Sequence, residues 1–301
     1  MAVAGALQHA RGRRPQGASP VDVISVQSQV VYGHAGNSAA AEPLRQLGLR
    51  VAEVPTTLLS NAPVYPTTRG RVLPADWITD LLRGVDERGL PARAGMLLSG
   101  YLGTVANGEA LADWVERVVP RHPRLRFCLD PVLGDMHIGT YVEPGLAQVF
   151  RERLLPRAGM LALNAYELGQ LSGHECLTEA ECLRAADELL RRGPDCIVVH
   201  GIEHGDGTLG SVAVDAAVRC RIGSPRLPID VTGTGDVFAA LLVGFIVRGE
   251  PLPRALERAT AGVHHALERT LQAQREELEI QLAAPAALGD GRPRFAAEPI
   301  A

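Results

Sequence analysis

The sequence contains few aromatic residues and no long apolar run. Aromatic side chains make up 4% of the 301 residues, and no stretch approaches the roughly 20 apolar residues of a membrane-spanning helix. Basic residues are not in excess, because the formal net charge is −4. Neither a nucleic acid nor a membrane is therefore expected as the principal partner, although a local anion pocket is still compatible with this charge.

Several common functional motifs are also absent. No Gly-Lys-Ser or Gly-Lys-Thr follows a glycine-rich loop, so a Walker A site is excluded. A Gly-x-Gly-x-x-Gly after the first predicted strand and a Gly-x-Ser-x-Gly elbow are missing too, which argues against a Rossmann dehydrogenase and an α/β-hydrolase. His200 and His204 have the spacing of a helical metal pair, but Gly201 and Gly205 disfavour a helix there.

The cysteines and the N-terminus give no sign of secretion. The five cysteines are odd in number and include no Cys-x-x-Cys pair, which is typical of reduced, mostly buried thiols in a cytoplasmic protein. They are Cys128, Cys176, Cys182, Cys196 and Cys220. The basic residues near the N-terminus are followed by proline and by no apolar region, so residues 1–20 are expected to form a disordered tail rather than a signal peptide.

The remaining composition is that of one globular domain. Hydrophobic residues make up 46% of the chain and charged residues 21%, which supplies enough apolar surface for a core. No linker divides the chain, and residues 284–301 are rich in Ala, Pro and Gly. We therefore expect a single domain over residues 21–283, followed by a flexible tail over 284–301.

Predicted strands and helices alternate along this domain. Strands are expected at 21–27, 50–56, 94–99, 125–129, 159–163 and 195–200; helices are expected at 39–47, 74–88, 105–119, 179–192, 236–248 and 253–282. Residues 208–214 and 217–222 alternate apolar and polar side chains around a turn, which predicts an antiparallel hairpin. The pattern indicates an α/β fold with a mostly parallel sheet and helices on both faces. The proline-broken segment 58–66 is expected to lie over a site or an interface.

The stretch from Asp230 to Asp236, which leads into a strongly apolar helix, is the most informative one. Two glycines, Gly233 and Gly235, lie just before that helix, where unpaired N–H groups and the helix dipole favour an anion. Asp236 has two interpretations, a helix cap or a catalytic or ligand-binding acid. Its place at a helix N-terminus predicts a lowered pKa and a mild base.

Polar residues follow several other predicted strands. They are Ser28, Tyr101, Asp130, Asn164 and His200. Because ligands of parallel sheets collect beyond the carboxyl ends of the strands, these residues are expected to share one site with Asp236.

Carboxylates near an anion-binding turn point to phosphoryl transfer with a divalent cation. Asp130, Asp135 and Glu167 are candidate Mg²⁺ ligands, directly or through water, since this ion prefers oxygen. Two alternatives remain open: Asp130 could stabilise the turn before Pro131, and Glu167 could pair with an arginine.

Five motifs in order along residues 21–283 resemble the pyridoxal kinases of the ribokinase-like superfamily. They are Gln27–Asn37, Ser99–Gly103, Asp130–Asp135, Asn164–Glu167 and Gly233–Asp236. The first is the most specific to pyridoxal, whereas the others recur among sugar and vitamin kinases. The resemblance implies a three-layer αβα sandwich, a homodimer, and phosphorylation by ATP and Mg²⁺ of the 5′-hydroxymethyl group of pyridoxal, with pyridoxine and pyridoxamine as further substrates.

The resemblance also assigns roles to residues. Asp236 would be the catalytic base, and the amides of Gly233, Thr234 and Gly235 would form the anion hole. The residues implied at the vitamin are Ser28, Gly33, Asn37, Tyr101 and Asp236. Those implied at ATP are Asp130, Ala162, Asn164, Glu167, His200 and Thr234.

Two departures from the family pattern stand out. Pro63 and Val64 replace a Thr and Gln that contact the vitamin in relatives, and His200 replaces a lysine. A histidine is mostly neutral at pH 7, so ATP binding is expected to be weaker and to improve as the pH falls toward 6. The alternatives are a hydroxymethylpyrimidine or sugar kinase of the same superfamily, and a pyridoxal-binding protein without turnover.

Overall fold

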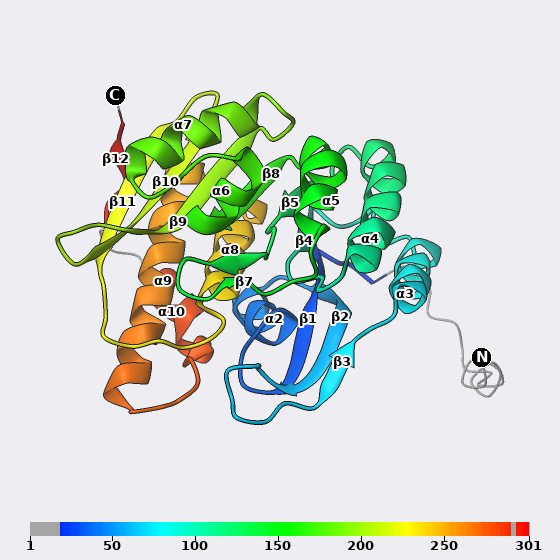
Figure 1. The fold of residues 1–301 in the computed structure, drawn as a ribbon, viewed down its shortest axis with the longest axis horizontal. Helices are drawn as coiled ribbons and strands as arrows, with labels where there is room; N and C mark the ends of the chain where they lie inside the picture. Colours follow the sequence, from blue (N-terminus) through cyan, green and yellow to red (C-terminus); the bar gives the residue numbers. More distant parts are fainter. Residues whose placement is uncertain (1–18, 290–292, 301) are drawn as a thin grey trace.

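The computed structural model describes residues 19–289 and 293–300, which contain one large twisted sheet (Figure 1). In that part of the chain the strand order is β12-β11-β10-β9-β8-β5-β4-β1-β2-β3. The strands are β1 (Val23–Tyr32), β2 (Val51–Asn61), β3 (Gly70–Val72), β4 (Met96–Ser99), β5 (Arg126–Leu129), β8 (Met160–Asn164), β9 (Cys196–Glu203), β10 (Thr208–Asp215), β11 (Arg219–Pro225) and β12 (Glu298–Pro299). Neighbours from β9 through β2 pair in parallel, and the strands at both edges pair antiparallel.

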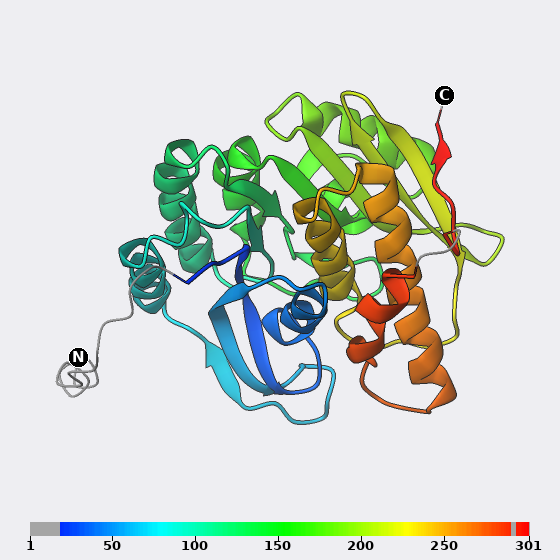
Figure 2. The same cartoon turned by 180° about the vertical axis from the view of Figure 1, so that it is seen from behind.

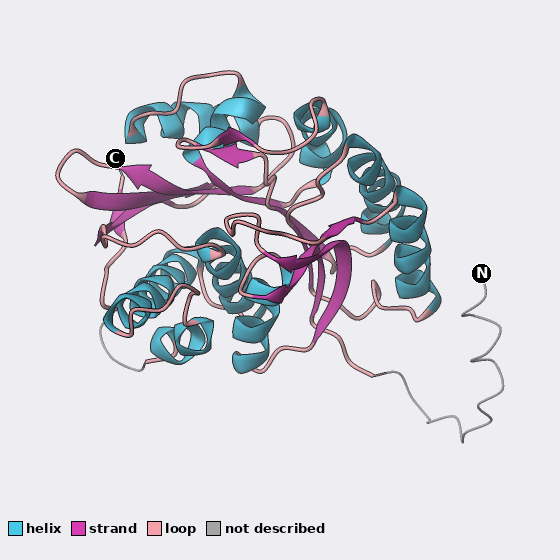
Figure 3. Cartoon of the chain, turned by 60° about the horizontal axis from the view of Figure 1, so that its bottom comes forward, coloured by secondary structure: helices cyan, strands magenta, loops and turns pink. Residues whose placement is uncertain are grey.

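Helices cover both faces of this sheet (Figure 3). One face packs against α3 (Ala75–Glu87), α4 (Val105–Val118), α5 (Leu146–Val149), α6 (Ala165–Ser172) and α7 (Glu179–Leu190). The other packs against α2 (Asn37–Gln46), α8 (Thr234–Val247), α9 (Leu252–Gln272) and α10 (Ala283–Ala287), which are seen from their own side in Figure 2. A small separate hairpin consists of β6 (Gly134–Asp135) and β7 (Gly139–Thr140). The expected α/β sandwich with an antiparallel hairpin edge is confirmed.

The central strands are buried on both faces. In β4, Leu97 faces one helical layer while Met96 and Leu98 face the other, and all three are at most 1% exposed. Each such side chain contributes about 1.5 to 3 kcal/mol by leaving water. This explains why these strands read as continuous apolar runs in the sequence.

Helix α8 is the most deeply buried helix of its layer. Residues 237–245 are all buried, because α8 lies between the sheet and the neighbouring helices α2 and α9. A Cβ at Gly244 would lie 2.6 Å from Leu47 Cδ1, so glycine allows α2 to approach closely. This packing fixes the N-terminus of α8 relative to the ends of the strands.

Strand β1 is longer than predicted. It continues past Gln27 to Tyr32 and pairs with β2 as far as Asn61, with an irregularity between Gln27 and Gln29. At this irregularity Gln27 pairs with Pro55, which has no N–H to donate. The Asn37 amide donates instead to the Gln27 and Val54 carbonyls, at 3.2 and 3.3 Å. The first part of the segment 58–66 is therefore strand rather than a loop.

The predicted helix over 253–282 ends ten residues early, at Gln272. Gln274 has a φ of 52°, and the Arg275 N–H donates to the Thr270 carbonyl at 3.0 Å, which closes the helix by a left-handed turn. Gly or Asn usually occupies such a position, so the sequence carries no ordinary stop signal here.

The flexible C-terminal tail expected from residue 284 is wrong for the described residues there. Ala283, Ala284 and Ala287 of α10 are at most 4% exposed, and β12 pairs with β11. Small side chains let α10 pack closely on α9, and a Cβ at Gly262 would lie 2.7 Å from the Ala283 carbonyl oxygen. The expected N-terminal tail lies outside the described residues, apart from residues 19 and 20.

None of the helices in the described ranges is both long enough and apolar enough to cross a membrane.

Candidate active site

The turn before α8 lies against the loop that follows β1. Gly233 has a φ of 89°, and a Cβ there would lie 2.4 Å from the His34 carbonyl oxygen. Glycine is therefore required twice, for the left-handed backbone and for the close contact. Because α8 begins at Thr234, the N–H groups of Thr234, Gly235 and Asp236 lie in its first turn, where helices bind anions.

Asp236 is the third residue of α8 and does not cap it. The N-cap residue is Gly233, without a side-chain hydrogen bond, and the Asp236 carboxylate instead accepts the Gly36 N–H at 2.9 Å. Burial raises the pKa of Asp236 to about 6, although the Gly36 N–H lowers it. The capping interpretation is therefore wrong, because the carboxylate bonds Gly36 and not the start of α8. The expected lowered pKa is also wrong, since the effect of burial outweighs that of the Gly36 N–H. The group is still mostly ionised at pH 7.

Asn164 and Glu167 form a capping box at the start of α6. The Asn164 side chain accepts the Glu167 N–H at 2.9 Å, and Glu167 Oε2 accepts the Asn164 N–H at 2.9 Å. Glu167 Oε1 also accepts the Leu133 N–H at 3.1 Å, and the Asn164 amide donates to the Gly134 carbonyl at 2.9 Å. These bonds fix the segment that leads to the β6–β7 hairpin. The alternative of an arginine partner for Glu167 receives no support from the described contacts.

Asp130 and Glu167 are buried carboxylates that repel each other. They are 4% and 3% exposed. Burial first, and then the charges of Glu167 and Asp236, raise the pKa of Asp130 well above its ordinary value; burial likewise raises the pKa of Glu167. Such a pair would be stabilised as anions by a cation at the site.

The three predicted metal ligands do not form a cluster. Within residues 19–289 and 293–300, no group of three or more His, Cys, Asp or Glu side chains could hold a metal ion. The Asp135 carboxylate accepts the His137 and Ile138 N–H groups at 2.8 and 2.7 Å, so it stabilises the hairpin turn. Any Mg²⁺ here would complete its shell with water and phosphate oxygens, as this ion usually does.

Two tyrosines lie beside the carboxylates. The Tyr101 and Tyr141 rings are stacked with centroids 6.4 Å apart. The pKa of Tyr141 is raised, mainly by burial and to a smaller extent by the negative charges of the nearby acids Glu167, Asp236, Asp130 and Asp135. The ends of β4, β5, β8 and the start of α8 thus meet around these rings, as expected for the carboxyl edge of the sheet.

The remaining residues predicted at the vitamin occupy β1, the loop after it and the start of α2. Ser28 is 7% exposed, and a Cβ at Gly36 would lie 2.4 Å from its hydroxyl oxygen. Asn37 is fully buried, and its amide bonds the backbone of β1 and β2, so it positions the strands and offers no open surface to a ligand. Ala162, predicted at ATP, is also fully buried, in the layer that packs against α8.

His200 lies beside the start of α8. Its ring is 4.9 Å from the Phe238 ring, and a Cβ at Gly235 would lie 3.5 Å from His200 Cε1. Burial lowers the pKa of His200 to about 4, so the expected gain of charge near pH 6 is wrong. The chain contains no lysine, all thirty basic residues being arginines, and so no ammonium side chain takes the place of the missing cation.

Two site features were missed in the sequence. Gly36 supplies the N–H that binds Asp236, and Glu277 accepts the His34 N–H at 3.0 Å. Gly36 was visible as part of the first motif, but Glu277 was placed inside a long predicted helix. Only the early end of α9 brings it to the site.

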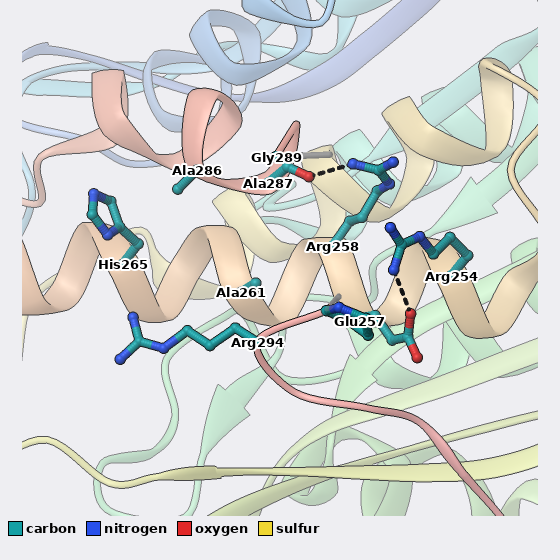
Figure 4. A pocket seen from close by; sticks show the side chains of 10 residues that line it. Arg254, Glu257, Arg258, Ala261, His265, Ala286, Ala287, Gly289 and Arg294 are labelled. Carbon is teal, nitrogen blue, oxygen red and sulfur yellow. Dashed lines mark hydrogen bonds and ion pairs between the residues drawn. The ribbon is translucent and has the colours of Figure 1, made fainter. Parts of the chain in front are cut away.

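A cavity outside this site lies between α9 and the C-terminal segment (Figure 4). Its volume is about 320 Å³, and its arginines already have partners. Arg254 binds Glu257 at 3.0 Å, Arg258 donates to the Ala287 carbonyl at 2.6 Å, and Arg294 binds Glu268 at 2.6 Å. The cavity therefore offers little free positive charge to an anion.

Comparison with known proteins agrees with this geometry. Residues 95–281 match a family model described as phosphomethylpyrimidine kinase. A protein named pyridoxal kinase PdxY from Rubrobacter xylanophilus is 41% identical over 88% of this chain and 92% of its own length. A pyridoxine/pyridoxal/pyridoxamine kinase from Bordetella bronchiseptica is 40% identical over 86% of this chain and 93% of its own.

A solved structure matches nearly the whole chain. The pyridoxal kinase from Leishmania donovani in complex with ADP and ginkgotoxin superposes with a TM-score of 0.83 and 25% identity, covering 92% of this chain and 99% of that one. The fold is the three-layer sandwich of the ribokinase-like superfamily. The chain belongs to the pyridoxal kinase family.

Proposed function

We propose that the chain transfers the γ-phosphoryl group of ATP to the 5′-hydroxymethyl group of pyridoxal, and also to pyridoxine and pyridoxamine. The observation that carries this is the Asp236 carboxylate, held by the Gly36 N–H in the first turn of α8. The start of α8 thus combines a base, Asp236, with N–H groups that can bind an anion. Kinases of this family, named for these vitamers, match the chain over most of its length.

Asp236 acts as the base in this proposal. With a pKa of about 6 it is mostly ionised at pH 7, and it accepts the proton of the hydroxymethyl group as the oxygen attacks phosphorus. The N–H groups of Gly233, Thr234 and Gly235 stabilise the negative charge on the transferred phosphoryl group, with the α8 dipole adding to them. No covalent enzyme intermediate is required.

The buried carboxylates support a role for Mg²⁺. Asp130 and Glu167 would hold the ion, Asp130 most directly, since both Glu167 oxygens already accept backbone N–H groups. Mg²⁺ would supply positive charge to the ATP phosphates. Asp135 is left to the hairpin turn. A chain without lysine depends on such a cation more than one that has a lysine near the phosphates.

Recognition of the two substrates divides between the strand ends. Tyr101 and Ser28 contact the pyridine ring, with Gly33 close by and Asn37 acting through the strands that it joins. Thr234, Asn164 and His200 lie on the ATP side, with His200 acting as a neutral ring. The L. donovani relative, solved with ADP, supports a nucleotide in this fold.

We also propose a cytoplasmic homodimer that binds neither nucleic acid nor membrane. Five buried free cysteines favour a reducing compartment. The distal part of β1, β2 and the following loop exposes apolar side chains, among them Val31 at 80%, Leu58 at 48% and Val64 at 68%. We propose that the dimer covers these apolar side chains. Light scattering measures the molar mass in solution, and Val31→Asp is expected to give monomers. Monomeric wild-type protein at micromolar concentration would refute it.

A second candidate is phosphorylation of a hydroxymethylpyrimidine, which the description of the family model favours. That model covers the ATP side and the catalytic helix but begins after Gln27–Asn37, the motif that points to pyridoxal. Sugar phosphorylation ranks behind because the motif Gln27–Asn37 points to pyridoxal. Binding without turnover ranks behind because the base and the anion site are both present.

One assay separates these functions. Purified protein is incubated with ATP, Mg²⁺ and, in turn, pyridoxal, pyridoxine, pyridoxamine, hydroxymethylpyrimidine and ribose, and the products are identified by mass spectrometry. We expect phosphate on the B6 vitamers. Phosphate only on the pyrimidine or the sugar would refute the proposal, and pyridoxal binding without any product would favour a non-catalytic protein.

A further inference from the structure

The segment after α9 reaches across to the ends of β1 and β2. Its far end is held back on α9, because the Glu279 N–H donates to the Thr270 hydroxyl oxygen at 2.9 Å. Two adjacent acids with different contacts lie between the end of α9 and Glu279. Glu276 is exposed and accepts the Tyr32 hydroxyl at 2.6 Å, whereas Glu277 is half-buried and accepts the Tyr65 hydroxyl and the His34 N–H.

Gly33 lets Glu277 lie directly against the backbone. Its φ is 80°, and a Cβ there would lie 2.3 Å from Glu277 Oε1. Within the described part of the chain, Glu277 forms no ion pair, so neutral donors alone hold its carboxylate in the contacts found. The glycine and the bond to His34 together place an acceptor oxygen of Glu277 against the backbone at this position.

The loop held by Glu277 also contacts the catalytic helix at two points. The His34 carbonyl lies against Gly233, where a Cβ would be 2.4 Å away. The Gly36 N–H donates to Asp236 at 2.9 Å. One short loop, residues 33–37, thus connects Glu277 on one side with the base and the anion hole on the other.

We propose that Glu277 is a positioning residue, which holds the 33–37 loop so that the Gly36 N–H fixes the Asp236 carboxylate for proton transfer. This rests on the proposed role of Asp236 as base. Misplacing a reacting group by about 1 Å can cost about 10²-fold in rate. The Gly36 N–H also lowers the pKa of Asp236 against the effect of burial, so a displaced loop raises that pKa.

Other titratable groups near Asp236 come from elements that Glu277 does not touch. They are Asp130 after β5, Glu167 of α6 and Tyr141 after β7, together with His200 of β9, which lies beside Gly235. Changes at Glu277 leave them in place, so a shift in the pH profile reports on the loop.

The kinetic test compares Glu277→Ala and Glu277→Gln with Glu276→Ala. Glu276 is the matched control, because it is adjacent and also binds a tyrosine hydroxyl but bonds no N–H of the loop. For Glu277→Ala we expect kcat about 10- to 100-fold lower, KM for ATP within about two-fold, and the acid limb of the rate profile moved to higher pH. Glu277→Gln keeps one acceptor and should fall between. A kcat and acid limb equal to those of Glu276→Ala would overturn the proposal.

A second measurement does not depend on turnover. Amide hydrogen exchange of a peptide that spans residues 33–37 should be at least about ten-fold faster in Glu277→Ala and unchanged in Glu276→Ala, with the urea midpoint of each recorded to exclude global unfolding. Unchanged exchange in Glu277→Ala would refute the positioning role. A wild type that phosphorylates no alcohol would instead refute the proposed function, whatever the exchange result.

Discussion

Replacing the proposed base should remove activity and add stability in the same variant. In the folded chain the pKa of Asp236 rises from its ordinary 3.8 to about 6, which means that folding disfavours the ionised form. At about 1.4 kcal/mol per pKa unit, this corresponds to about 3 kcal/mol at neutral pH. Partial exposure of the side chain reduces the value through solvent screening, to about 1 to 2 kcal/mol. Asp236→Asn is neutral at every pH and should gain that amount.

The sign of the effect fixes its pH dependence. A raised folded-state pKa gives the wild type its full stability below pH 4, and this stability is lost as the pH rises through about 6. The advantage of Asp236→Asn should therefore be small at pH 4, intermediate at pH 5 and largest at pH 8. The same variant should lose about 10²- to 10⁴-fold in kcat, because the amide accepts no proton.

Two assays on the same preparations test this prediction. Urea unfolding at pH 5 and pH 8 gives the free energies, and initial rates of pyridoxal phosphorylation give kcat. Asp80→Asn on the exposed face of α3 is the control, expected to change neither quantity. A variant that is no more stable than wild type at pH 8 would refute the burial argument, and near-normal turnover would refute the role as base.

Three further predictions concern the same site. Gly233→Ala should lower kcat at least about 100-fold while the protein still folds, since a Cβ would meet the His34 carbonyl at 2.4 Å; normal rates would show that this contact is dispensable. Asp130→Asn should raise the Mg²⁺ concentration for half-maximal rate about ten-fold or more, whereas Asp135→Asn should leave it unchanged; equal responses would contradict the assignment. The KM for ATP should be flat between pH 6 and 8 because the pKa of His200 is about 4, and a several-fold fall in KM toward pH 6 would count against its burial.

Much of the architecture could be predicted because local patterns and the global fold agree. The strand from Met96 to Ser99 is a short, mostly apolar run followed by a glycine, and the hairpin of β10 and β11 alternates around Asp215. Both signals depend on residues close together in the chain. The convergence of Tyr101, Asp130 and Asn164 follows from the rule that parallel strands share a carboxyl edge.

The predictions that the structure does not support concern residues whose side chains are buried. The pKa of Asp236 was predicted from the helix dipole alone, while its burial comes from the surrounding carboxyl edge of the sheet. Asn37 lies in a family motif and Ala162 precedes one, yet both are fully buried. A motif gives the position of a residue in the chain but not the direction of its side chain.

The role of Glu277 could not be predicted for a different reason. Residues 253–282 have helical periodicity, and the helix ends at a left-handed Gln274 where Gly or Asn is usual. Without that break, Glu277 would lie within a helix, and nothing in the sequence would place it beside His34. Its contact with the loop is long-range information, which only the folded chain contains.

Competition between two substrates tests the central claim most directly. Equal concentrations of pyridoxal and hydroxymethylpyrimidine are mixed with wild-type protein, Mg²⁺ and limiting ATP, and the ratio of phosphorylated products gives the ratio of the two kcat/KM values. Phosphorylation of pyridoxal through Asp236 predicts pyridoxal 5′-phosphate as the main product, formed at least ~100-fold more slowly by Asp236→Asn. Phosphorylated pyrimidine as the main product, or the same rate in the variant, would contradict it.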